Sequence, residues 1–164
     1  MIAGGVLMTS CQKDEIGGTA TQKIAGEWVV TADAASADGS IAIEDPFGLG
    51  RFNIDTYNTG KNVPTEMWVD DNGNFWEFKI VADLDYTAAI FSTKDYVPND
   101  YYDSKVKITG GKVLYGAAKT PSGMPADSIV FYVSFDDDDY PAKYGYENYK
   151  VSGYRYTGFA NDDE

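Results

Sequence analysis

The chain has 164 residues, a hydrophobic content of 43% and a formal net charge of −13, which is enough for about one domain with an apolar core. This charge excludes nucleic acid as a partner, because phosphate binding needs clustered Lys and Arg side chains, and it disfavours attachment to an anionic membrane by charge. The sequence contains no histidine, so the commonest general base, the commonest metal ligand and every imidazole-dependent nucleophile are excluded.

The N-terminal segment leads to the only cysteine of the chain, Cys11. Residues 1–10 are mostly apolar or small, and Leu7-Met-Thr-Ser-Cys11 resembles a lipobox, where a bacterial signal peptidase leaves a lipidated cysteine as the new N-terminus. A secretory leader normally begins with basic residues, which this segment lacks, so we expect residues 1–10 to be the end of a signal peptide that starts upstream. The alternative is a disordered apolar N-terminus with a free thiol.

Residues 11–22 are polar and contain glycine, which is typical of a flexible tether between a lipid and a domain. Within them, Gln12-Lys-Asp-Glu15 resembles the signal that sends some Bacteroidetes lipoproteins to the outer face of the outer membrane. The sequence therefore predicts a cell-envelope protein that contacts the outer membrane through the Cys11 lipid only. The folded domain is expected at residues 23–160, followed by an acidic tail at residues 161–164.

From Ile24 onward the sequence indicates short β-strands, because aromatic and β-branched residues recur between turn residues and no segment keeps a 3.6-residue apolar period. No helix longer than a turn is expected. The expected strands cover residues 24–32, 50–57, 66–70, 74–84, 87–93, 104–109, 112–115, 127–136 and 149–159.

Two glycine-containing pairs predict tight hairpins. Asn72-Gly73 is expected to form a two-residue turn in which both residues have positive φ, and Gly110-Gly111 is expected to join two strands in the same way. The segment from Asp70 to Asn74 is superficially similar to a calcium loop. Its glycine is misplaced for that role and no bidentate acid ends it, so a hairpin turn is the better interpretation.

Alternation along the strands assigns each of them one apolar face. Two rows are expected to point to the same interior: Trp76, Phe78 and Ile80 in one strand, and Ile129, Phe131, Val133 and Phe135 in another. A meander of this kind closes as a barrel or packs as a sandwich, and the hairpin connections without a cysteine pair favour the barrel. The predicted fold is all-β, a single up-and-down β-barrel of about eight antiparallel strands.

The first and last strands of the predicted barrel carry a Trp and an Arg, respectively. Trp28 follows Gly26 at the start of the first strand, and Arg155 lies in the last strand, a pattern that resembles lipocalin-like (calycin) barrels, which close one end in this way. A guanidinium over an indole ring gains about 0.5–2 kcal/mol. Trp28 and Arg155 are therefore the expected barrel-closing pair.

Longer segments carry a more specific resemblance. Glu66-Met-Trp-Val-Asp-Asp-Asn-Gly-Asn-Phe-Trp76, together with residues 120–130, 133–137 and 149–159, is similar to a family of Bacteroidetes lipoproteins catalogued as lipid-binding putative hydrolases. The resemblance covers roughly residues 22–160 and implies an eight-stranded calycin-like barrel on a lipid anchor. It implies no catalytic residues, because no motif that defines them accompanies it.

Catalysis without histidine or a usable cysteine would need a Ser-Lys pair, paired carboxylates or a metal. Ser122 lies in Pro-Ser-Gly without a Gly-x-Ser-x-Gly elbow, which indicates a turn. Asp136, Asp137 and Asp138 belong to the densest acidic run and are the candidates for Ca²⁺, although an acidic loop after a strand is usually only solvated. We assign no catalytic residue, metal or cofactor from the sequence.

The interior of an eight-stranded barrel is either filled by its own side chains or holds one small ligand. The preferred function is binding of a hydrophobic or lipid-like molecule inside the barrel. The alternatives are an uncharacterised hydrolase, as the resemblance implies, and a non-catalytic surface interaction module with a solid barrel. The oligomeric state is left open. The candidates for lining a ligand cavity are Trp28, Trp76, Phe78, Phe91, Phe131, Val133 and Phe135.

Overall fold

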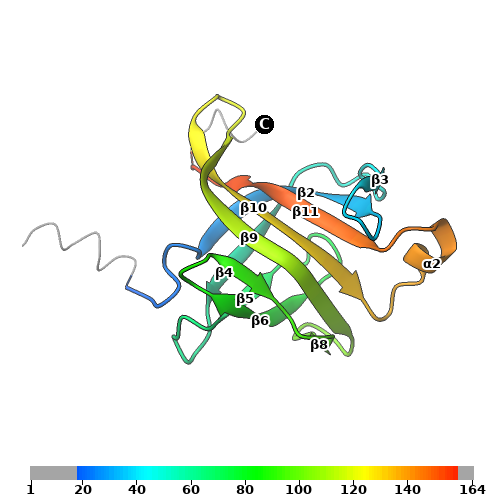
Figure 1. Cartoon of the computed structure of the whole chain (residues 1–164), viewed down its shortest axis with the longest axis horizontal. Coiled ribbons are helices and arrows are strands. Elements are labelled where there is room, and N and C mark those ends of the chain that lie inside the picture. The colour runs from blue at the N-terminus through cyan, green and yellow to red at the C-terminus, as the bar shows by residue number, and fades with distance from the viewer. Residues whose placement is uncertain (1–17, 159–164) are drawn as a thin grey trace, which may run out of the picture.

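Eight antiparallel strands follow one another around a closed barrel in the computed structural model, which describes residues 18–158 (Figure 1). The strands are β2 (Gly26–Ala35), β4 (Phe52–Asn58), β5 (Glu66–Asp70), β6 (Lys79–Asp85), β7 (Ile90–Ser92), β9 (Lys105–Lys119), β10 (Pro125–Phe135) and β11 (Asn148–Arg155). Pairing of β11 with β2 closes the circuit. The predicted up-and-down barrel is confirmed.

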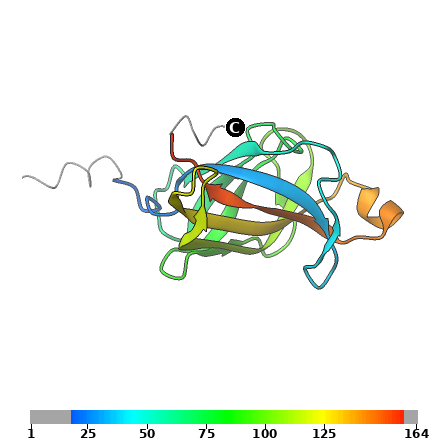
Figure 2. The same ribbon diagram turned by 90° about the horizontal axis from the view of Figure 1, so that it is seen from above.

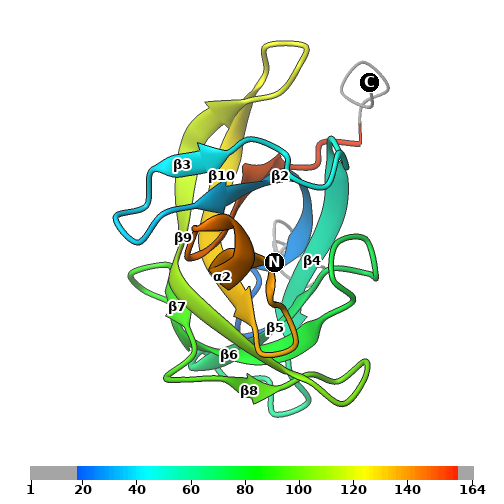
Figure 3. The ribbon, with the colours of Figure 1, turned by 90° about the vertical axis from the view of Figure 1, so that its right-hand side faces the viewer.

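Three short elements lie outside this circuit. Strand β3 (Ile41–Ile43) pairs with β2, and strand β8 (Val97–Pro98) pairs with β9. Helix α2 (Tyr140–Tyr144) follows β10 and lies across one end of the barrel, which we call the mouth (Figure 3). Among the residues that the structure describes, no helix is long and apolar enough to cross a membrane.

The prediction of a hairpin at Gly110-Gly111 is wrong, because β9 runs without interruption from Lys105 to Lys119. The pairing register shifts there, so that the two glycines oppose only Phe131 of β10, which makes them a β-bulge. Gly110 has a φ of +61°, and a Cβ at Gly111 would lie 2.5 Å from the carbonyl oxygen of Phe91. Glycine is therefore needed here for a bend in a long barrel strand rather than for a chain reversal.

The turn between β5 and β6 is longer than the predicted two-residue hairpin. Asn72 and Gly73 do have positive φ, but the next strand begins only at Lys79. The reason is the fully buried Asp71 carboxylate. It accepts backbone N–H groups from Gly73, Phe75, Trp76, Glu77 and Phe78 at 2.8–3.1 Å. Trp76 and Phe78 are consequently held by this turn and do not alternate along a strand.

The predicted alternation in β10 is confirmed. Ile129, Phe131 and Val133 are fully buried, whereas Val130 and Tyr132 on the opposite face are half-buried. The buried row packs against apolar side chains from the other strands of the barrel, so the described part of the chain has one continuous core.

The N-terminal part of the described chain joins the barrel at the end opposite α2 (Figures 1 and 2). Residues 19–24 form turns in which Thr21 and Ile24 are fully buried, so the packed part of the chain starts before the expected boundary at residue 23. The predicted signal peptide (1–10), Cys11, the first part of the tether and the acidic tail (161–164) lie outside the described residues.

Candidate functional site

The barrel end opposite the mouth is closed by Trp28 and Arg155. The guanidinium carbon of Arg155 lies 4.3 Å from the centroid of the fully buried Trp28 ring. Nε of Arg155 donates to Asp127 at 2.9 Å, and its two Nη atoms donate to the carbonyl oxygens of Ala25 and Lys23 at 2.6 and 2.7 Å. Each guanidinium nitrogen is thereby occupied, which makes this end a structural cap.

The residues expected to line a ligand cavity lie in the barrel core, with one exception. Trp76 is half-buried at the mouth, whereas the others are at most 4% exposed. Phe91 contacts Phe131 with ring centroids 5.7 Å apart, and Phe78 contacts Phe135 at 5.5 Å. These side chains stabilise the barrel by packing on one another, and an open interior cavity stays a prediction. The buried members are Trp28, Phe78, Phe91, Phe131, Val133 and Phe135.

Six aromatic rings gather at the mouth and form what we call the mouth cluster. They come from the β3–β4 loop, the β5–β6 turn, β10, α2 and β11. The ring centroids of neighbouring members lie 4.8–6.5 Å apart, the range in which aromatic pairs attract. Loops that are distant in sequence are thus joined over the core. The members are Phe47, Phe75, Trp76, Phe135, Tyr140 and Tyr149.

Two consecutive carboxylates fasten the mouth cluster. Asp137 accepts hydrogen bonds from Trp76 Nε1 at 3.0 Å and from the Tyr102 hydroxyl at 2.7 Å. Asp138 accepts one from the Tyr149 hydroxyl at 2.5 Å. Burial, together with the hydrogen bond to Asp138, raises the pKa of Tyr149 well above its usual value, so this hydroxyl stays protonated. The β10–β11 loop is therefore tied to three other segments.

The candidate calcium ligands Asp136, Asp137 and Asp138 bind separate donors of the protein itself. Asp136 accepts the backbone N–H of Lys105, whereas Asp138 accepts the hydroxyl of Tyr149. Within residues 18–158, no group of three or more acidic side chains is arranged to hold a metal ion. The contacts of this acidic run fit a role in fastening loops.

An apolar pocket of about 310 Å³ opens at the mouth between the β3–β4 loop and α2. We call it the mouth pocket. Tyr144 is 58% exposed and Phe47 36% exposed, so large ring faces are in contact with water here. The volume falls at the lower end of the roughly 300–1,000 Å³ that small-molecule sites occupy. Its lining consists of Ile43, Pro46, Phe47, Tyr140, Tyr144 and Tyr146.

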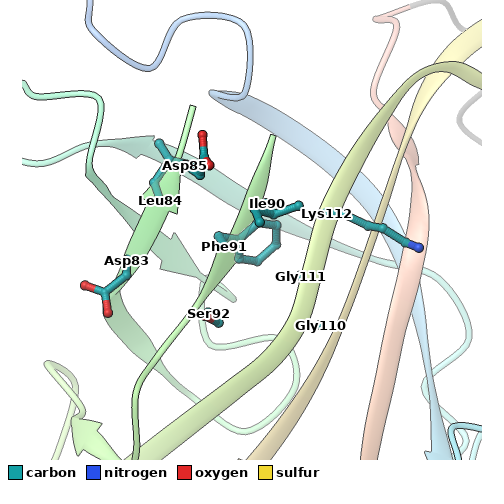
Figure 4. Close-up of a pocket in the computed structure, with 9 residues that line it drawn as sticks. All are labelled: Asp83, Leu84, Asp85, Ile90, Phe91, Ser92, Gly110, Gly111 and Lys112. Atoms are coloured by element: carbon teal, nitrogen blue, oxygen red, sulfur yellow. The ribbon is translucent and has the colours of Figure 1, made fainter. Parts of the chain in front are cut away.

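A second pocket, of about 480 Å³, lies in the barrel wall across β6, β7 and β9 (Figure 4). Asp83, Asp85 and Lys112 stand at its rim, which is the combination that acid–base catalysis would need. Figure 4 shows the two carboxylates diverging and the Lys112 amine extending away from both. This wall pocket therefore does not present a facing pair of catalytic groups.

Sequence reasoning missed the mouth pocket because its residues lie in loops, a short helix and the end of the three-residue strand β3, outside the longer strands where alternation can be read. One signal was available in the segment from Tyr140 to Tyr146. Pro141 stands at the first turn and Gly145, with a φ of +80°, ends the helix, which is the usual asymmetry of helix termini. This arrangement places Tyr140 and Tyr144 on one face of a single helical turn.

Comparison with known proteins gives one family. A family model described as lipid-binding putative hydrolase matches residues 13–160 of the chain. No curated protein matches the chain. The matched range spans the capped end, the core and the mouth pocket.

Proposed function

The chain belongs to the family of lipid-binding putative hydrolases, and on that premise we propose that it binds an apolar, lipid-like molecule at the mouth of its barrel. The observation that carries this proposal is the mouth pocket, an apolar recess with exposed ring faces that adjoins the mouth cluster. Transfer of apolar surface out of water contributes about 25 cal/mol per Å² buried. A ligand gains most where the protein itself leaves such surface exposed.

Phe47 connects the pocket to the mouth cluster. Its ring lines the pocket and also contacts Tyr149 and Phe75 with centroids 5.5 and 5.9 Å apart. A ligand seated on Phe47 would therefore extend the aromatic packing of the barrel outward. Binding deeper in the barrel would require displacement of fully buried side chains, which costs packing energy. These contacts favour the mouth over the interior.

A fluorescent apolar probe tests the proposal. N-phenyl-1-naphthylamine, which is uncharged, should bind the full chain with 1:1 stoichiometry. Tyr144→Ala and Ile43→Ala should each raise its Kd roughly fivefold, because each removes about 1 kcal/mol of apolar contact. Tyr115→Ala is the matched control, since Tyr115 is 51% exposed and lies near Arg155 at the capped end. Equal Kd values for all four proteins, or no binding at all, would contradict the proposal.

Catalysis is not part of the proposal. The divergent rim groups of the wall pocket and the protein-bound carboxylates of the acidic run give no observation that favours a hydrolytic step. Binding without turnover is the function that the mouth pocket supports best. Ester substrates with an alkyl chain should act as ligands of the mouth pocket and remain intact.

We further propose that Cys11 carries a lipid that anchors the protein to the outer membrane. The lipobox-like sequence that ends at Cys11 supports this proposal. The N-terminal part of the described chain joins the barrel at the end opposite α2 (Figure 1), so we expect an anchored protein to hold its mouth pocket away from the membrane. Metabolic labelling with an alkyne fatty acid should mark the wild-type precursor, and equal labelling of Cys11→Ala would contradict the anchor.

A further inference from the structure

The mouth pocket is unusually rich in aromatic rings. Four of its six lining side chains are aromatic: Phe47, Tyr140, Tyr144 and Tyr146. The ring centroid of Tyr140 lies 5.7 Å from that of Phe47 and 6.0 Å from that of Tyr144, so three of them form adjoining walls. Aromatic faces carry partial negative charge, and several of them around one space are typical of sites for quaternary ammonium groups.

A cation already lies on one of these rings. The Lys143 ammonium is 5.4 Å from the centroid of Tyr144, within the distance at which a ring face attracts a positive charge. This contact shows that the Tyr144 face is accessible to cations at the protein surface. It also makes Lys143 a built-in competitor for a cationic ligand.

Acidic residues flank the lining residues of the mouth pocket in the sequence. Residues 43–47 and 138–147, which contain the lining residues, carry five acidic side chains and one basic side chain, Lys143. One of them is coupled to the lining, because Asp138 accepts from Tyr149, whose hydroxyl lies 3.0 Å from that of Tyr146. This arrangement attracts a positive group and repels a carboxylate or phosphate. The five acids are Glu44, Asp45, Asp138, Asp139 and Glu147.

From the aromatic walls and the acidic residues that flank them in the sequence, we infer that the ligand of the mouth pocket is a cationic amphiphile, with its amine or quaternary ammonium group held among the rings of Phe47, Tyr140 and Tyr144. This inference rests on the proposed function and names the chemical class of its ligand. The alkyl part covers the apolar side chains of Ile43 and Pro46, and the positive group faces the rings.

The test compares three detergents with one tail: decyltrimethylammonium, the neutral decyl maltoside and the anionic decanoate. Each competes with N-phenyl-1-naphthylamine for the full chain below its micelle concentration, in about 0.15 M salt so that distant charges are screened. The cation should bind at least about fivefold more tightly than the neutral detergent, and the anion most weakly.

Two variants separate the aromatic contribution from general charge attraction. Tyr144→Leu keeps an apolar side chain but loses the ring, so it should retain decyl maltoside binding and lose most of the preference for the cation. Lys143→Gln removes the competing ammonium, so it should bind the cation more tightly. Tyr115→Leu, at the capped end, should change neither the affinity for decyl maltoside nor the preference for the cation.

The outcomes distinguish this inference from the proposed function. Equal affinities for the cationic and neutral detergents would overturn the inference and leave apolar binding in place. An unchanged cation preference in Tyr144→Leu would also overturn it, because charge alone would then account for the selectivity. Failure of all three detergents to displace the probe would count against the proposed function itself.

Discussion

The Trp76 ring stacks on the Phe135 ring, with centroids 4.8 Å apart and planes inclined by 11°. This contact joins the β5–β6 turn to the last residue of β10, two segments that no strand pairing connects directly. The buried carboxylate of Asp71 fixes the turn on one side, and Asp137 accepts the indole N–H of Trp76 on the other. Both the backbone and the indole of Trp76 are therefore held by carboxylates.

Removal of the Asp71 carboxylate should open this turn. Asp71→Ala leaves five backbone N–H groups without their acceptor, and we expect a loss of at least about 3 kcal/mol in the free energy of unfolding, since bonds to charged groups contribute about 1.5–3 kcal/mol each. Asp71→Asn should cost less because one oxygen remains. Urea denaturation followed by tryptophan fluorescence measures both.

The matched control for Asp71 is Asp103→Ala, which truncates an exposed aspartate in the β8–β9 loop. Its effect should stay within about 0.5 kcal/mol, as for most surface substitutions. Comparable losses for Asp71→Ala and Asp103→Ala would show that the carboxylate does not organise the turn.

The capped end of the barrel should show coupling between its two residues. Trp28→Ala should cost about 3–5 kcal/mol as a large-to-small change in the core. Arg155→Ala should cost less, and the double variant should fall short of the sum by about 0.5–2 kcal/mol, the value of the cation–π contact. Strictly additive losses in a urea-denaturation cycle would contradict an energetic contact between them.

The stability of the folded protein should depend on pH through the carboxyl group of Asp55. Burial, with repulsion from Glu27 and Asp70, raises the pKa of Asp55 in the folded state. The folded protein therefore binds the proton of the Asp55 carboxyl more tightly than the unfolded chain does. Protonated Asp55 thus adds to the free energy of unfolding at low pH, and this contribution is lost as the pH rises through the pKa of the folded state. Asp55→Asn should stabilise the protein at pH 7.

The gain from Asp55→Asn should shrink as the pH falls and vanish below the ordinary carboxyl pKa of about 3.9. Thermal or urea unfolding of both proteins between neutral and acid pH measures this difference. A constant gain across the whole range would mean that the carboxylate charge is not the cause.

The hydroxyl of the fully buried Tyr149 should contribute to the stability of the protein. Tyr149→Phe keeps the ring in the mouth cluster but removes the donor to Asp138 and the partner of Tyr146. We expect a loss of about 1–3 kcal/mol, because two buried or half-buried polar groups lose their partner. Tyr96→Phe, at an exposed tyrosine of the β7–β8 segment, serves as the control. Equal stability of the two variants would contradict a fastening role.

The parts of the fold that the sequence predicted are those governed by alternation. The buried row of β10 and the barrel itself follow from residues whose spacing of two fixes their face. Gly110-Gly111 was misinterpreted because a glycine pair serves equally in a hairpin and in a bulge, and only the pairing with β10 decides between them. The role of Asp71 depends on a turn that folds around its carboxylate, and no local sequence pattern predicts such a turn.

The candidate site was less accessible to sequence reasoning. The strand pattern identifies Trp76 and Phe135 as aromatic candidates. In contrast, Phe47 lies in the β3–β4 loop and Tyr140 and Tyr144 lie in the short helix α2, and the positions of both segments depend on the closed barrel. Their meeting at the mouth arises from long-range contacts, such as the 5.7 Å approach of Phe47 and Tyr140.

Photoaffinity mapping tests the central claim most directly, because it reports where a bound apolar molecule lies. An alkyl probe with a diazirine group, bound to the full chain and irradiated, should label peptides that contain Ile43–Phe47 and Tyr140–Tyr146, and decyl maltoside should suppress this labelling. Tyr144→Ala should weaken the labelling of both peptides. Labelling concentrated on the interior row of β10, with the mouth peptides unmarked, would contradict it.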